Sequence, residues 1–314
     1  MRVRRIPKGG GRFRTIYCPN AKEKRRLQAL LPALAKLERE LAWKAGVAHV
    51  AHGFVAGRNP VTCALAHVGF QVTVSCDLES WFDSVTDKQL LAAGVPPEIV
   101  SQITIQDEHG VGRCRQGLPT SPVAANLVAT VFDQRLIALL RIHFKDDFAY
   151  TRYADDVTVS VNSNNTEAIT KDIWITAWNM GWKVNESKTH IQHAKAGRRI
   201  VVGIAVDDGI QATRKTRRRL RAARHQAIGP RPIRSVTGIK FKANPNASNS
   251  ANGIAEWAAC KLPRCARGPR RIMGVLSGGS GPASITARTD ERAAVVVAGS
   301  ARRIILPTET NGAP

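Results

Sequence analysis

Alternating apolar and polar residues mark two stretches of the chain as β-strands. Residues 148–161 read FAYTRYADDVTVSV, in which β-branched and aromatic residues flank two adjacent acids. This pattern predicts a tight β-hairpin that carries Asp155 and Asp156 at its turn. A second β-rich run begins at Phe70 and reaches Asp77. It predicts a third carboxylate at the end of another strand.

Apolar residues at three- and four-residue steps predict two long helices around these strands. The first covers residues 21–47, where charged residues lie opposite a stripe of leucines. The second covers residues 123–140 and is rich in Ala, Leu and Val. Prolines stiffen its entry, and the hydroxyl of Thr120 or Ser121 is suited to cap its first turn.

A third helix and a strand pair are predicted farther along the chain. Residues 165–180 form an amphipathic pattern with Ile169, Ile173 and Trp174 on the apolar side. Residues 199–209 combine a β-branched run with Asp-Asp-Gly, which indicates a hairpin.

The pattern weakens beyond about residue 230. Residues 244–250 and 278–282 are rich in Asn, Ser, Gly and Pro, which predicts linkers or disorder. Residues 293–306 contain one candidate strand. The last quarter of the chain therefore gives little guidance about its structure.

Composition adds a strong indication of a polyanionic partner. The chain has 314 residues, of which 43% are hydrophobic, so it can bury a sizeable core. Its 47 Lys and Arg outnumber 24 Asp and Glu, which leaves a net charge of +23. Nucleic acid is the default partner of such a chain. A ribosomal or chromatin-type protein shares this charge but does not need a cluster of acids.

Cysteine usage and hydropathy indicate the compartment. The six cysteines are scattered, and only Cys260 and Cys265 lie close together, without a second ligand pair. Free thiols in a reducing cytoplasm are therefore expected, with neither disulfides nor zinc. No apolar stretch is expected to approach the ~20 residues of a membrane span, and no signal core is visible at the start. A cytoplasmic protein without a membrane partner is predicted.

The acidic residues suggest a divalent metal centre. Adjacent carboxylates repel each other unless a cation lies between them, and Mg²⁺ suits carboxylates completed by substrate phosphates. Asp77, Asp155 and Asp156, brought together from separate strands, could hold two Mg²⁺ ions for an in-line phosphoryl displacement. A solvated Asp-Asp turn is the alternative, because turns are rich in Asp for their own reasons.

Two motifs in this order resemble the palm of a reverse transcriptase. One is Asp77-x-x-x-x-Phe82, followed by YADD at residues 153–156. The other is QGLPTSPVAAN at residues 116–126, whose Pro-Thr-Ser-Pro is typical of retron enzymes. The matching segments extend over about residues 4–225. The resemblance implies an α+β right-hand polymerase fold, with fingers, a palm built on an antiparallel sheet and helices, and a helical thumb.

The resemblance also implies a division of the chain into regions. Residues 1–70, with part of 88–115, correspond to the fingers. Residues 71–195 correspond to the catalytic palm, and residues 196–243 to a thumb with a basic RNA-binding helix. Residues 244–314 form an atypical tail, expected to be partly disordered.

A set of residues around the incoming nucleotide follows from the same resemblance: Lys8, Arg14, Phe82, Gln116, Gly117 and Lys188. Lys8 and Arg14 lie in a glycine-rich segment that resembles the fingers hairpin, although a flexible basic hairpin tip is an equal reading. An aromatic at Phe82 would exclude a 2′-hydroxyl, provided that it, rather than Trp81, faces the site from a strand. Lys188 would act at the leaving pyrophosphate, with a surface-loop lysine as the alternative.

Basic residues in the segment 213–225 suggest contact with a nucleic acid backbone. Four arginines share one side of a predicted helix: Arg214, Arg217, Arg218 and Arg221. Charge runs are usually solvated, but this density of cations repels strongly without a polyanion, so a thumb helix on RNA or a hybrid is expected.

One histidine lies in a segment that resembles a retron signature. Residues 63–67 read CALAH, where retron enzymes carry Asn-Ala-x-x-His, so Cys63 departs from the pattern. His67 is expected either to face RNA or to pack inside the protein.

Taken together, the resemblance implies a retron-type reverse transcriptase. Such an enzyme binds one structured noncoding RNA as template and primer, uses dNTPs with two Mg²⁺ ions or substituting Mn²⁺, and produces an RNA-linked single-stranded DNA called msDNA. These systems are associated with antiphage defence through an effector protein. The alternatives are another bacterial reverse transcriptase, of group II intron or abortive-infection type, and an RNA-binding relative without catalysis.

Overall fold

The computed structural model describes residues 1–218, 221, 235–236 and 239–240. The expected linkers at 244–250 and 278–282 lie outside the described residues. So do the candidate strand at 293–306 and the two neighbouring cysteines, Cys260 and Cys265.

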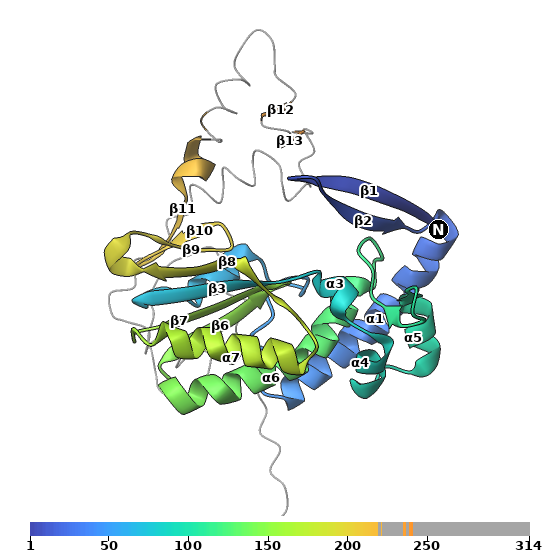
Figure 1. The fold of residues 1–314 in the computed structure, drawn as a ribbon, viewed down its shortest axis with the longest axis horizontal. Coiled ribbons are helices and arrows are strands. Elements are labelled where there is room, and N and C mark those ends of the chain that lie inside the picture. Colours follow the sequence, from blue (N-terminus) through green and yellow to red (C-terminus); the bar gives the residue numbers. More distant parts are fainter. Residues whose placement is uncertain (219–220, 222–234, 237–238, 241–314) are drawn as a thin grey trace, which may run out of the picture. The chain divides into compact units, whose positions relative to one another are not determined.

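An antiparallel sheet of four strands forms the centre of the described structure (Figure 1). Its order is β6 (Phe148–Tyr153), β7 (Asp156–Val161), β3 (Val72–Leu78) and β8 (Val184–His193). The predicted hairpin is confirmed as β6 and β7, and the predicted Asp77 strand as β3. Helices and antiparallel sheet together give the expected α+β class.

Alternation along these strands divides the sheet into an apolar and a polar face. In β3, the apolar Val72, Val74 and Cys76 are buried in the main hydrophobic core. The residues between them are polar and lead to Asp77. Because successive side chains of a strand point to opposite faces, the acids lie on the face turned away from this core.

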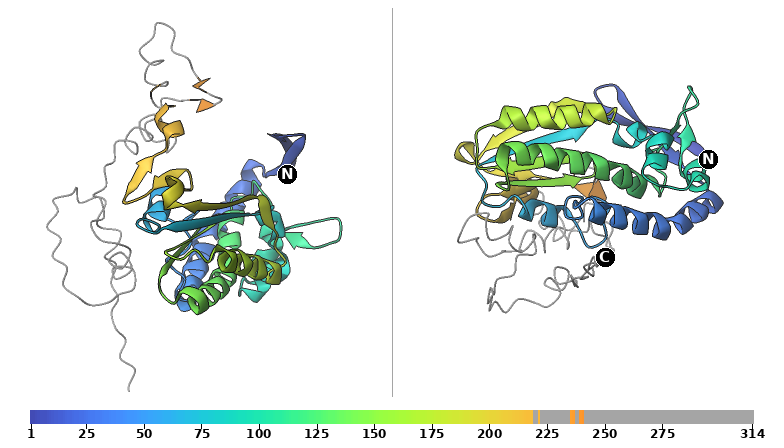
Figure 2. Two further views of the ribbon diagram at one scale, coloured as in Figure 1. Left: turned by 60° about the vertical axis from the view of Figure 1, so that its left-hand side comes forward. Right: turned by 90° about the horizontal axis from the view of Figure 1, so that it is seen from below.

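Three helices build the core on the apolar face (Figure 2): α1 (Ala21–Lys44), α6 (Ser121–Phe144) and α7 (Thr166–Asn179). Helix α1 packs on α6, and α6 packs on α7. A capping box fixes the start of α1, since Asn20 accepts from the Glu23 amide and Glu23 accepts from the Asn20 amide. All three helices predicted from the periodicity are confirmed.

Helix α6 differs from expectation in two respects. It is long and apolar enough to cross a membrane by composition alone, so the expectation that no stretch approached this length was wrong. Two thirds of its apolar window are buried, as befits a core helix. The predicted cap is also wrong: Thr120 makes no capping bond, and the Ser121 hydroxyl donates to the Arg115 carbonyl (2.7 Å).

Helix α7 buries only part of its predicted apolar side. Ile169 and Ile173 are fully buried, whereas Trp174 is 38% exposed. Trp178 lies one turn farther along the same side and is 79% exposed. The prediction for Trp174 was wrong because its position turns away from the sheet.

The N-terminal residues form a two-stranded hairpin of β1 (Arg2–Gly9) and β2 (Arg12–Cys18). Gly10 and Gly11 form its tip with φ of +59° and +71°, which glycine adopts without strain. The hairpin is joined to the rest of the protein by the Tyr17 amide, which donates to the Gln116 carbonyl (2.8 Å).

Short elements complete the described structure. Those between β3 and α6 are α3 (Trp81–Ser84), α4 (Asp87–Ala92), α5 (Pro97–Ile103), β4 (Ile105–Gln106) and β5 (Gly112–Arg113). Those after β8 are η1 (Ala194–Ala196), β9 (Arg199–Val201), β10 (Ile204–Val206), β11 (Ile210–Ala212), β12 (Ser235–Val236) and β13 (Ile239–Lys240). The expected hairpin at 199–209 is thus part of a three-stranded sheet, β11-β10-β9.

A second, smaller core lies between α2 (Pro60–Leu65) and the sheet of β9 to β11. Beside it, His67 is fully buried and contacts Ser160 Oγ through Nδ1 (2.8 Å) and Thr151 Oγ1 through Nε2 (2.7 Å). Burial lowers the pKa of His67 to about 3, so the ring is neutral. His67 is therefore a packing residue, and the reading that it faces RNA was wrong.

Candidate active site

Strand register brings the three predicted acids together. In the antiparallel pair of β3 and β7, Asp77 lies directly opposite Asp156. The Leu78 amide donates to the Asp155 carbonyl (3.0 Å), which fastens the end of β3 to the turn between β6 and β7. Three carboxylates from two segments, the end of β3 and the β6–β7 turn, thus converge at one end of the polar face.

The turn that carries Asp155 is conformationally strained. Tyr153 pairs with Asp156, so Ala154 and Asp155 form a two-residue hairpin loop. Ala154 has φ of +59°, a left-handed conformation that costs a non-glycine residue about 1–3 kcal/mol. Gly53 packs so closely on this turn that a Cβ there would overlap the Ala154 nitrogen. The loop before α2 therefore supports the turn from outside the hairpin.

Burial and the neighbouring acids raise the pKa values of Asp155 and Asp156. Loss of solvation comes first for Asp156, followed by the charges of Asp155 and Asp77, and together they raise its pKa to about 6. The pKa of Asp155 is also raised, mainly by burial and then by Asp77, while Lys188 and Arg14 act in the opposite direction. An excess of negative charge is therefore held at this point.

An irregularity in β8 carries Lys188 into the site. While β3 advances from Ser75 to Asp77, β8 advances from His190 to Asn185. The extra residues bulge out of the ladder, and Lys188 Nζ reaches Asp77 Oδ2 at 2.8 Å. Lys188, predicted to act at the leaving pyrophosphate, thus lies beside Asp77, and its side chain is more than half exposed.

The chemistry of these donors suits a hard divalent cation. Carboxylate oxygens are the ligands that Mg²⁺ prefers, and a cation between them would relieve their repulsion. Within the described residues, no group of three or more Asp, Glu, His or Cys side chains has a geometry that could coordinate a metal ion. Asp77 is instead turned to Lys188. Asp77, Asp155 and Asp156 therefore fit a metal by charge and donor type, and a bound ion would compete with Lys188.

The aromatic pair after Asp77 lies on a helix, whereas a strand was expected. Trp81 and Phe82 begin α3. Trp81 is 3% exposed and belongs to the core, while Phe82 is only partly buried and has Phe54 at 6.1 Å between ring centroids. The choice of Phe82 over Trp81 as the accessible aromatic agrees with this arrangement, although the strand reasoning behind it was wrong.

Gln116 and Gly117 lie where the N-terminal hairpin meets α6. Gly117 has φ of +106°, and a Cβ at this position would overlap the Tyr17 carbonyl oxygen. Only glycine permits both this backbone conformation and so close an approach. The Gln116–Gly117 segment thus packs closely against the end of β2 and forms its docking site, the seat of the hairpin.

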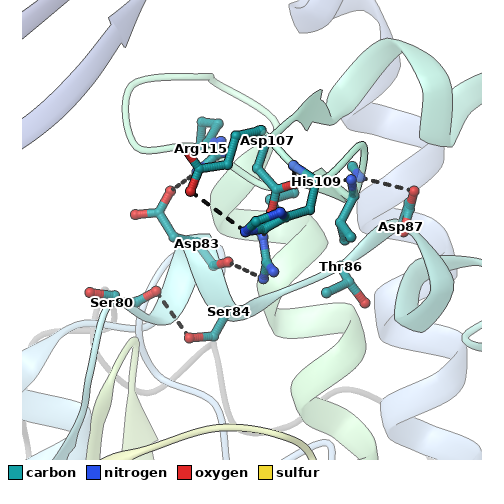
Figure 3. Close-up of polar contacts among 12 residues, drawn as sticks. Ser80, Asp83, Ser84, Thr86, Asp87, Asp107, His109 and Arg115 are labelled. Carbon is teal, nitrogen blue, oxygen red and sulfur yellow. Dashed lines mark hydrogen bonds and ion pairs between the residues drawn. The ribbon is translucent and has the colours of Figure 1, made fainter.

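Arg115, directly before Gln116, joins this seat to the aromatic helix (Figure 3). Its Nη1 donates to Asp83 Oδ1 (2.9 Å), and its guanidinium lies 5.5 Å from the centroid of the Tyr17 ring. Asp83 directly follows Phe82 in α3. One side chain therefore connects the Phe82 helix, the Gln116 loop and the hairpin, a role that the sequence motifs did not indicate.

The two basic residues predicted for the hairpin differ in their relation to the acids. Arg14 is exposed and close enough for its charge to lower the pKa of Asp155. Lys8 is exposed near the hairpin tip and forms no ion pair with another described residue. Arg14 is thus close enough to interact electrostatically with Asp155, whereas Lys8 lies near the hairpin tip.

The predicted basic helix is described only in part. Residues 214–218 are helical, as is residue 221. The four predicted RNA-binding residues are all exposed: Arg214, Arg217, Arg218 and Arg221. None of these four arginines forms a salt bridge with another residue that the structure describes. Their positive charge is therefore available to a polyanion.

Comparison with known proteins identifies the class to which this fold and site belong. Residues 6–239 match the reverse transcriptase (RNA-dependent DNA polymerase) family. The chain therefore belongs to the reverse transcriptase family. Telomerase from Candida albicans, solved in complex with a TWJ fragment of telomeric RNA, aligns with a TM-score of 0.50 and 14% identity over 68% of this chain and 45% of that chain. This likeness shows the right-hand polymerase fold.

The curated relatives are more specific. The retron Mx65 reverse transcriptase from Myxococcus xanthus is 34% identical over 245 residues, covering 70% of this chain and 54% of the relative. The retron Mx162 reverse transcriptase from the same species is 35% identical over 176 residues, covering 49% and 34%. The chain spans about half or less of the length of these two relatives.

Proposed function

We propose that this chain is an RNA-directed DNA polymerase that copies a structured noncoding RNA into a short, RNA-linked single-stranded DNA. The convergence of Asp77, Asp155 and Asp156 on the polar face of the sheet carries this proposal. The excess negative charge at that point suits divalent cations, and the net charge of +23 suits a nucleic acid partner. The family match and the retron relatives support it.

The proposed regions follow the expected boundaries. Residues 1–70, with part of 88–115, form the fingers, and residues 71–195 form the palm around the acids. Residues 196–243 form the thumb. This division is supported by the hairpin seated on Gln116 and by the exposed arginines that follow β11.

The three acids would hold two Mg²⁺ ions, with Mn²⁺ as a substitute, and bound ions would activate the attacking hydroxyl and stabilise the leaving oxygen. Lys188 would move from Asp77 toward the departing pyrophosphate and neutralise or protonate it. Arg14 and Lys8 would contact the triphosphate of the incoming dNTP. The Lys188 and Arg14 side chains are exposed and can change position, and Lys188 would leave its ion pair with Asp77 to do so.

Substrate selection would depend on the other side of the site. Phe82 would pack beneath the sugar of the nucleotide and exclude a ribose 2′-hydroxyl. Gln116 and Gly117 would line the nucleotide and the primer-template. The arginines of the basic helix would bind the backbone of the RNA or hybrid. Priming from a 2′-hydroxyl of the RNA, a separate effector protein and a role in antiphage defence complete the proposal.

Purification from the native locus, beside the Asp155→Asn variant, tests this function. Co-purifying nucleic acid is sequenced after RNase treatment. A discrete DNA, present only with the wild type and joined to one neighbouring noncoding RNA, is the expected result. RNA that co-purifies equally with both proteins, without DNA, would favour the non-catalytic RNA-binding alternative.

A further inference from the structure

A fully buried arginine lies directly beneath the acidic turn. Arg152 precedes Tyr153 in β6 and points to the apolar face, where it has no solvent exposure. Its Nε and Nη2 donate to the two carboxylate oxygens of Asp133 in α6, each at 2.9 Å. Nη1 donates to Asn126 Oδ1 (2.9 Å) and to the Ala154 carbonyl (3.2 Å). One guanidinium thus links the core helix to the strained residue of the turn.

The acceptors of this arginine are themselves held in place. The Tyr150 hydroxyl donates to Asp133 Oδ1 (2.5 Å). Asp133 raises the pKa of Arg152 and, together with burial, that of Tyr150, so the arginine stays charged and the phenol stays neutral. A buried charge is tolerated only when its hydrogen bonds are satisfied. Here a two-pronged pair, fixed by a third donor, supplies that geometry.

Asn126 extends the same network to the opposite side of the turn. While its oxygen accepts from Arg152, its Nδ2 donates to the Gly53 carbonyl (2.9 Å). Gly53 is the residue whose backbone packs against the Ala154 nitrogen. Arg152 therefore binds the Ala154 carbonyl, and Gly53 packs against the Ala154 nitrogen. Asn126 is hydrogen-bonded to both Arg152 and Gly53.

The network also reaches the aromatic helix. The Arg152 guanidinium lies 5.4 Å from the centroid of the Trp81 ring. Trp81 is the core residue beside Phe82, whose ring centroid lies 5.3 Å away. Arg152 therefore contacts both the turn that carries the acids and the core residue that packs beside Phe82.

We propose that Arg152 is a positioning residue that, with Asp133 and Asn126, sets the conformation of the turn and so the separation of Asp155 and Asp156 from Asp77. This inference rests on the proposed polymerase function. The role is geometric. Nε and Nη2 of Arg152 bind Asp133 on α6, and Nη1 binds the carbonyl of the strained residue Ala154. Lysine preserves the charge but cannot make these bonds together.

Arg152→Lys and Arg199→Lys form a matched pair for the test. Arg199 is equally buried, at 1% exposure, and donates to the His67 carbonyl (3.0 Å) and Thr73 Oγ1 (2.9 Å) on the other face of the sheet. Both variants lose the hydrogen bonds of a buried guanidinium, so both lower the Tm. Only Arg152 touches the turn, which separates positioning from general stability.

Two measurements are compared across the pair. The first is Mn²⁺ binding to each purified protein, measured from the EPR signal of free Mn²⁺. Binding that is lost in the Asp155→Asn variant is assigned to the acids. The second is the Mg²⁺ concentration that half-saturates DNA synthesis on poly(rA)·oligo(dT). Arg152→Lys is expected to weaken both about tenfold or more, a loss typical of residues that orient metal ligands. Arg199→Lys is expected to leave both at the wild-type value.

The outcomes separate this inference from the proposed function. Wild-type protein that makes no DNA, but whose Mn²⁺ binding Arg152→Lys weakens, contradicts the polymerase and supports the positioning role. Active Arg152→Lys with wild-type metal dependence overturns the positioning role alone. Equal metal defects in both variants also overturn it, since they reflect stability. Wild-type protein that binds no Mn²⁺ at the acids overturns both.

A second variant covers the case in which Arg152→Lys fails to fold. Asn126→Ala leaves the ion pair of Arg152 and Asp133 in place and removes the two bonds of the Asn126 amide, one from Arg152 Nη1 and one to the Gly53 carbonyl. It is expected to weaken Mn²⁺ binding in the same direction, by a smaller factor than Arg152→Lys would. Unchanged binding in folded Asn126→Ala overturns the proposal.

Discussion

The two faces of the central sheet treat charge in opposite ways. On the polar face, burial and the neighbouring acids raise the pKa values of Asp155 and Asp156, and Lys188 offsets only part of the negative charge there. On the apolar face, Arg152 and Asp133 balance each other in a fully buried pair. An unbalanced cluster marks a place where a cation belongs, whereas a balanced one fixes structure. The arginine network on one face thus supports the acids on the other.

The largest effect is expected from removing one of the unbalanced charges. Asp155→Asn should lower kcat by about 10³-fold or more, because several kcal/mol of charge stabilisation are lost. RNA binding, measured on filters with the same template, should stay at the wild-type level because the basic surfaces are untouched. Substantial synthesis by this variant contradicts the assignment of the acids.

Crowding the turn should have the next largest effect. In Gly53→Ala, the added Cβ overlaps the Ala154 nitrogen and displaces the turn, so kcat should fall about 10²-fold, as for a misplacement near 1 Å. Gly209→Ala is the matched control, since its added Cβ meets nothing within 4 Å. Equal kinetics for both alanine variants would show that the hold on the turn is unimportant.

Removing the accessible aromatic should change selectivity more than rate. Phe82→Ala should raise incorporation of UTP relative to dTTP by about 10–100-fold, because a steric contact against the 2′-hydroxyl is lost. The ratio of kcat/KM values on poly(rA)·oligo(dT) measures this. Phe54→Ala, which alters an exposed neighbouring ring, should leave the ratio unchanged. A similar change in both variants argues against a specific role for Phe82.

The smallest effect concerns the repulsion itself. Because the folded protein raises the pKa of Asp156 from its ordinary value to about 6, the folded state binds more protons there than the unfolded state. Stability contributed by the protonated form is therefore lost as pH rises through this range. In EDTA, Asp156→Asn should have a Tm about 2–4 °C above the wild type at pH 7 and none of this advantage at pH 4. A pH-independent difference contradicts the repulsion.

The same pKa predicts how pH affects metal dependence. Protons compete with a divalent ion for the carboxylates, so the Mg²⁺ concentration that half-saturates synthesis should rise as pH falls below about 6. Titrations of Mg²⁺ at several pH values measure this. Half-saturation that does not change between pH 7 and pH 5 argues that these acids are not the ligands.

Much of the fold and the acidic site could be predicted from the sequence because they depend on short-range patterns. The period-two alternation around YADD predicted the hairpin, and the β-rich run from Phe70 predicted a strand that reaches Asp77; the structure pairs Asp77 with Asp156. The leucine period in residues 21–47 located α1. Local patterns of this kind survive in tertiary structure when one face of the element is buried.

The errors came from residues whose environment depends on distant partners. Trp81 and Phe82 continue a β-like run but fold into a short helix. His67, for which facing RNA and packing were both left open, is buried by contacts with the sheet, and Arg152, for which no prediction was made, is buried against α6. An arginine inside an apolar strand, together with Asp133 inside an apolar helix, was the available signal of a buried pair, but spacing alone does not bring them together.

Extension of oligo(dT) on poly(rA) by purified protein, with Mg²⁺ and dTTP, tests the central claim most directly. The account predicts DNA products from the wild type, none without a divalent ion, and a rate lower by about 10³-fold or more in Asp77→Asn, Asp155→Asn and Asp156→Asn at any Mg²⁺ concentration. DNA synthesis that persists near the wild-type rate in these three variants, or wild-type protein that binds the template and extends nothing, would contradict a polymerase centre at these acids.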